Sequence, residues 1–169
     1  MAYDISEWSD FALAHVGASA ALLGLVFVGL SINLREIVGS GQLVNRAAEA
    51  VVLLGGVLAT STVVLIPGQA RGALSADLIV LAAVMFAVIL YFQRGAAFQS
   101  ADPGKHGPPR GSLGLRRTIG LGVPVLFAIA GVTLAVSAGG GLYWWPPAVI
   151  LSYLGALTNA WILLIEILR

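Results

Sequence analysis

The feature that most constrains this chain is a long apolar run near its N-terminus, from Phe11 to Leu34. Asp10 precedes the run and Arg35 follows it, while the polar side chains inside it are only a histidine, two serines and an asparagine. An α-helix of this length crosses a hydrocarbon core of about 30 Å, with some tilt. The run is therefore predicted to be a membrane-spanning helix.

Four further apolar runs follow, and the composition agrees with a membrane protein: 59% of residues are hydrophobic and 10% are charged, against about a quarter charged in soluble domains. The connections are short, so the sequence predicts one all-α domain over residues 1–169, a polytopic transmembrane helix bundle. The third run, LIVLAAVMFAVILYF, has no strongly polar residue and is expected to face lipid. The five predicted spans are residues 11–34, 47–66, 77–93, 118–138 and 148–168.

The basic residues predict the orientation of these spans. Five spans place the two ends of the chain on opposite sides, and Arg71 is alone on one side. By the positive-inside rule, the N-terminus is predicted to be outside and the C-terminus cytoplasmic. The longest connection, residues 94–117, contains prolines, glycines and five basic side chains, and is predicted to be a flexible basic cytoplasmic loop. The basic residues on the predicted cytoplasmic side are Arg35, Arg46, Arg94, Lys105, Arg110, Arg116, Arg117 and Arg169.

Small residues repeat along the first span at alternating spacings of three and four. Helices in lipid associate through such residues, because small side chains let two backbones approach closely. This seam could form a contact within one bundle or a contact between identical subunits, and the sequence leaves both open. The seam consists of Ala14, Gly17, Ala21, Gly24 and Ser31.

Polar residues in the spans are the candidates for function, because burying charge in hydrocarbon is costly. His15 lies near the outer boundary, where it could relay protons; a neutral imidazole bonded to a neighbouring helix is favoured, given this shallow depth. Asn33 and Asn159 could line a pore, although packing between helices explains them more simply. Two interfacial ion pairs with a spacing of three residues are also predicted, Arg46 with Glu49 and Glu166 with Arg169.

Several kinds of chemistry have no matching residues. The chain has no cysteine, which excludes disulfides, thiolate metal sites and cysteine nucleophiles. His15 and His106 are predicted on opposite sides of the membrane, so a shared metal site within one chain is not expected. The glycine-rich segments lack the spacing of nucleotide-binding loops, and no basic, aromatic surface for nucleic acid is present. We therefore expect no enzyme activity, no cofactor and no nucleic-acid partner.

The run AALLGLVFVGLSINL, Ala20 to Leu34, followed by Arg46-Ala47-x-Glu49, resembles the opening of small uncharacterised multi-spanning membrane proteins of actinobacteria. The resemblance covers the first span and the start of the second, and it implies a bacterial plasma membrane. The sequence then predicts a non-enzymatic membrane protein that acts by helix–helix association, as a homo-oligomer or as an accessory subunit of a larger membrane complex. The alternative is a small oligomeric channel or transporter for an ion or small solute.

Overall fold

The structure is a computed structural model that describes residues 2–99 and 110–167, and every regular element in this part of the chain is helical. Five helices are long and apolar enough to cross a membrane, which confirms the predicted all-α fold with five spans. The elements are η1 (Ile5–Trp8), α1 (Ser9–Ile32), α2 (Leu34–Gly39), α3 (Gly41–Val64), α4 (Arg71–Gln99), α5 (Arg110–Ala135), η2 (Gly141–Trp144) and α6 (Trp145–Ile167).

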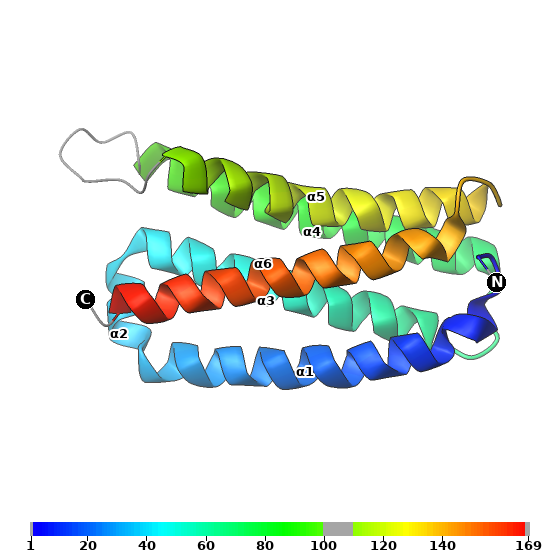
Figure 1. The fold of residues 1–169 in the computed structure, drawn as a ribbon, viewed down its shortest axis with the longest axis horizontal. Coiled ribbons are helices and arrows are strands. Elements are labelled where there is room, and N and C mark those ends of the chain that lie inside the picture. Colours follow the sequence, from blue (N-terminus) through cyan, green and yellow to red (C-terminus); the bar gives the residue numbers. More distant parts are fainter. Residues whose placement is uncertain (1, 100–109, 168–169) are drawn as a thin grey trace.

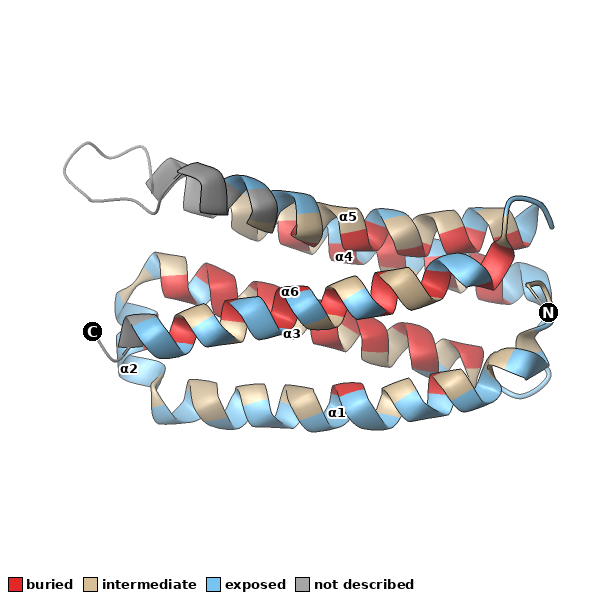
Figure 2. Ribbon diagram, viewed as in Figure 1, coloured by how far each residue is buried: buried red, intermediate tan, exposed pale blue. Residues whose placement is uncertain are grey.

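The long helices lie side by side along one axis and alternate in direction, so the two ends of the chain are at opposite ends of the bundle (Figure 1). We call these the η2 end, where the N-terminus lies, and the α2 end, where α6 finishes. Helix α3 is central, because it contacts α1, α4 and α6, while α5 packs against α4 and α6. Burial follows this arrangement: 13 of the 24 residues of α3 are buried, but only Ala12 and Ser19 of α1 (Figure 2).

The apolar sequence of α4 predicted that this helix faces lipid, but only one of its sides is exposed. One stripe of it is buried against α3 and α5, and Leu74, Leu78 and Ile89 in this stripe have no exposed surface. The opposite face is exposed, with Val80 at 60% and Tyr91 at 74%. A uniformly apolar sequence suits both environments, since lipid and protein core are equally apolar. The pattern therefore carries no information about which face packs.

The connections contain more helix than predicted. The segment after the first span forms the short helix α2, and α3 begins at Gly41, because only Ser40 adopts an extended backbone here. The predicted loop 94–117 is helical at both edges, since α4 continues to Gln99 and α5 begins at Arg110. Its three prolines all lie within 100–109, outside the described residues, so the residues flanking them contain no proline to stop a helix.

The N-terminal segment closes the η2 end of the bundle. Asp4 caps η1 by accepting hydrogen bonds from the backbone N–H and the hydroxyl of Ser6. The Ala2 carbonyl accepts from Leu142 N–H at 3.0 Å, and the Tyr3 hydroxyl accepts from Gly140 N–H at 3.1 Å. Gly140 has φ +111°, a left-handed conformation that glycine adopts without strain. The turn before α6 thus holds the N-terminus against the bundle.

Candidate functional site

A buried carboxylate lies between three helices toward the α2 end. Glu49 on α3 is 1% exposed, and Arg116 Nε on α5 donates to its Oε2. Gln93 Nε2 on α4 donates to its Oε1 at 2.9 Å. A charge buried in this way is stable only when it is paired and hydrogen-bonded, and Glu49 has both kinds of partner. We call Glu49, Gln93 and Arg116 the polar centre.

A glycine, Gly120, lets the backbone of α5 lie close to Glu49 and Gln93. Gly120 lies one helical turn after Arg116, and a Cβ atom at this position would clash with Glu49 Oε1 and Gln93 Nε2. Helix α5 therefore presents an arginine and then a bare backbone surface to the same carboxylate.

A cavity of about 140 Å³ adjoins the polar centre between α3, α5 and α6. Its polar lining includes Arg46, Asn159 and Thr158 as well as Glu49 and Arg116, and the remaining walls are apolar or glycine. Arg46 is 6% exposed and Asn159 is 4% exposed. The apolar and glycine walls are Leu53, Ile119, Gly120, Gly155 and Ile162.

Three of the predicted polar residues thus meet around one cavity: Arg46, Glu49 and Asn159. The sequence analysis missed Arg116, which it placed in the basic loop, as the partner of Glu49. The one available signal was that Arg116 and Arg117 are the last charged residues before an apolar run, at the same end of the bundle as Glu49. The second predicted pair lies outside this description, because neither the side chain of Glu166 nor any part of Arg169 is among the described residues.

His15 is bonded to a neighbouring helix. Its Nδ1 and the hydroxyl of Tyr153 on α6 are hydrogen-bonded at 2.9 Å. The ring also packs on Phe11, with centroids 4.3 Å apart, and Phe11 packs in turn on Trp145 at 5.1 Å. Trp145 is fully buried. A row of aromatic rings therefore joins α1 to α6 near the η2 end.

Asn33 lies away from the polar centre and from the row of aromatic rings, at the point where α1 passes into α2. Its Nδ2 donates to the Gly29 carbonyl at 3.0 Å, a local bond to the preceding turn of its own helix. Ser31 makes the same kind of bond to the Phe27 carbonyl at 2.8 Å. Such bonds satisfy a polar side chain in a membrane helix without a second helix. The candidate polar residues of α1 and α6 therefore have three separate surroundings.

The small-residue seam of α1 faces away from the rest of the chain. All five of its residues are exposed, whereas the buried residues of α1 are Ala12 and Ser19. With about 3.6 residues per turn, the seam and this buried face lie on opposite sides of the helix. A Cβ atom added at Gly17 or Gly24 would meet no packed neighbour within 4 Å. The seam is not the surface by which α1 packs in its own bundle.

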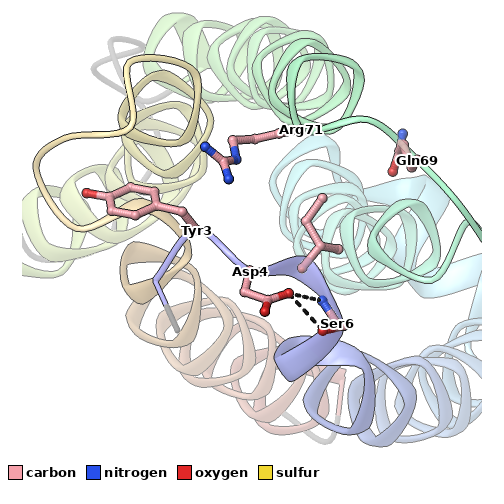
Figure 3. A pocket seen from close by; sticks show the side chains of 6 residues that line it. Tyr3, Asp4, Ser6, Gln69 and Arg71 are labelled. Carbon is pink, nitrogen blue, oxygen red and sulfur yellow. Dashed lines mark hydrogen bonds between the residues drawn. The ribbon is translucent and has the colours of Figure 1, made fainter.

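A wider hollow of about 560 Å³ lies on the surface at the η2 end (Figure 3). Tyr3, Asp4 and Ser6 line it from the N-terminal segment, and Gln69 and Arg71 line it from the start of α4 and the loop before it. The hydrogen bonds from Ser6 hold the pKa of the Asp4 carboxyl below its usual value. Arg71 Nη1 donates to the Ser137 hydroxyl at 2.9 Å, so this guanidinium ties the start of α4 to the turn after α5.

Among the residues that the structure describes, no group of three or more His, Cys, Asp or Glu side chains is placed to hold a metal ion. The polar centre offers one carboxylate, and its other members are hydrogen-bond donors to it. Comparison with known proteins finds no matching family model, no matching curated protein and no matching solved structure. The molecule is therefore placed by its own composition and architecture, as a helical membrane protein with several spans.

Proposed function

We propose that this chain is a non-enzymatic membrane subunit that self-associates through the outward face of α1. The observation that carries the proposal is the exposure of the whole small-residue seam. Glycine inside a helix costs roughly 1 kcal/mol relative to alanine, and within this chain Gly17 and Gly24 accommodate no packed neighbour. A second helix lying along the seam would use the close approach that these residues allow.

The internal polar groups support association rather than transport. His15, Asn33 and Asn159 would have to share one path to line a pore, and instead they occupy separate positions on α1 and α6 with separate surroundings. The Glu49 carboxylate is held by Arg116 and Gln93. The bonds of His15 and of Glu49 join helices within one bundle, and the outer face of α1 takes no part in them.

Disulfide crosslinking in native-like lipid tests this proposal. The chain has no cysteine, so Gly17→Cys places a single thiol in the seam, and Ala18→Cys is the matched control, because Ala18 is also exposed and lies at the same depth on another side of α1. We expect oxidation to give a covalent dimer of Gly17→Cys in much higher yield than of Ala18→Cys. The mass of the wild-type protein in lipid nanodiscs should be that of a dimer or larger assembly.

Replacing Ala21 by leucine adds bulk to the seam without touching the α3 face. We expect Ala21→Leu to reduce both the crosslinking of Gly17→Cys and the mass in lipid. Equal crosslinking at positions 17 and 18, or a monomeric mass that Ala21→Leu leaves unchanged, would contradict self-association through this face.

A further inference from the structure

The surface hollow at the η2 end brings two opposite charges face to face. Asp4 lines it from the N-terminal segment and Arg71 lines it from the start of α4, on opposite sides in Figure 3. Both side chains are exposed, and neither forms an ion pair with the other or with any other described residue. The hydrogen bonds from Ser6 are the main cause of the lowered Asp4 pKa, and the positive charge of Arg71 lowers it further. The two charges therefore influence each other across the hollow without closing it.

Both charged groups are held in place and keep bonding capacity for a ligand. The two hydrogen bonds from Ser6 end on Asp4 Oδ1, so Oδ2 remains for a further donor. Arg71 Nη1 donates to the Ser137 hydroxyl, and a guanidinium has five N–H donors in a planar fork that matches the oxygens of a phosphate. An ionised carboxylate only accepts hydrogen bonds. The hollow is thus arranged for a ligand with a cationic donor at one end and an anionic acceptor at the other.

The hollow lies at the membrane boundary at the η2 end. Helix η1 begins at Ile5 and α4 begins at Arg71, and the first and third apolar spans begin at the same two residues. Tyr143 and Trp144 are exposed at this end, and such aromatic side chains are enriched where hydrocarbon meets headgroups. The volume of about 560 Å³ is within the range of small-molecule sites, about 300–1,000 Å³. A zwitterionic lipid headgroup has the required pair of charges and lies at this depth.

We propose that this hollow binds a phosphoethanolamine group, with its phosphate on Arg71 and its ammonium on Asp4. Phosphatidylethanolamine supplies this group from the membrane, and glycerophosphoethanolamine supplies it from solution. The carboxylate selects an ammonium, which donates hydrogen bonds, over a trimethylammonium, which has no N–H, and it repels a headgroup that carries only a phosphate. Each contact between exposed charges contributes little alone, but a lipid is already concentrated at the site by the membrane. The hollow is separate from the α1 seam, so headgroup binding and self-association can fail independently.

The test compares the wild type and four variants in nanodiscs that hold equal amounts of phosphatidylethanolamine, phosphatidylcholine and phosphatidylglycerol. Asp4→Asn removes the charge but keeps a residue that caps a helix, and Glu7→Gln is its matched control, because Glu7 is exposed in the same segment but does not line the hollow. Arg71→Gln removes the positive charge, and Ser137→Ala is its control, because it removes only the bond to Arg71. Native mass spectrometry counts the retained lipids, and glycerophosphoethanolamine is added to the same proteins in detergent.

We expect phosphatidylethanolamine to be enriched over the other two lipids on the wild type, Glu7→Gln and Ser137→Ala. The enrichment should fall about two- to fivefold in Asp4→Asn and in Arg71→Gln. Asp4→Asn should also retain more phosphatidylglycerol, because the phosphate contact with Arg71 remains without the repelling carboxylate. Should Arg71→Gln not fold, Asp4→Asn against Glu7→Gln decides.

The detergent arm identifies the source of the group. Binding of glycerophosphoethanolamine to the wild type, with a loss in Asp4→Asn and Arg71→Gln, would support the site and add the free compound as a source. Enrichment of the lipid without binding of the free compound would support the lipid as the source. Equal responses in all five proteins, or a wild type that neither enriches the lipid nor binds the free compound, would overturn the proposal.

Discussion

At the scale of single residues, Gly120 decides whether the polar centre can form. Gly120→Ala would push its methyl group into Glu49 Oε1 and Gln93 Nε2, and these atoms cannot shift without loosening the hydrogen bonds between α3, α4 and α5. Overpacking of this kind costs about 1–3 kcal/mol. We expect Gly120→Ala to lower the free energy of unfolding by this amount, measured by denaturation in detergent mixed with SDS.

The matched control is Gly122→Ala, two residues further along α5, where an added Cβ meets nothing within 4 Å. This variant should be as stable as the wild type or slightly more stable, because alanine favours helix. Gly120→Ala should cost less stability in a Gln93→Ala background than in the wild type, since Gln93→Ala removes one of the two crowded atoms. Equal stability of the two alanine variants would contradict the role assigned to Gly120.

The polar centre also shows what residue patterns can predict. A spacing of three residues drew attention to Arg46 and Glu49, and both are buried beside one cavity. The hydrogen-bonded partners of Glu49 are 44 and 67 positions away in the chain, and no local spacing identifies them. Such partners follow from which helices become neighbours, and five similarly apolar spans do not encode that in their periodicity.

At the scale of elements, α1 is the least buried of the spans, and the hydrogen bond between His15 and Tyr153 joins it to α6. Removing the hydroxyl in Tyr153→Phe leaves the imidazole nitrogen without this partner. Hydrogen bonds between membrane helices contribute about 0.6–1.7 kcal/mol, and we expect a loss of stability in this range by the same denaturation assay. The control is Tyr91→Phe, because Tyr91 is exposed and packs on Phe92 through its ring. Equal losses in both variants would show that the bond contributes no stability.

The number and type of the long helices could be predicted because a span must contain about 20 apolar residues, whatever its neighbours. Helix ends were harder to predict, since the signals used were prolines and glycines. Gly39 and Gly41 suggested a loop, but the chain there breaks only at Ser40, between α2 and α3. The seam of α1 was visible in the sequence, yet its outward direction was not, because an apolar helix has no polar face to orient it.

At the scale of the whole molecule, the positions of the basic residues predict the orientation of the bundle. The α2 end carries Arg35 and Arg94, both exposed, whereas Arg71 is at the η2 end, bonded to Ser137. Because basic residues stay on the cytoplasmic side, we predict that the α2 end is cytoplasmic.

Single cysteines at Val38 and Ala70, both exposed and at opposite ends of the bundle, allow a direct measurement of this orientation with a membrane-impermeant maleimide. Ala70→Cys should react in intact bacterial cells and Val38→Cys only after permeabilisation, with the cysteine-free wild type as blank. The reverse pattern would invert the orientation and move the Arg116 cavity to the outer leaflet, while reaction of both in intact cells would be incompatible with a span between them.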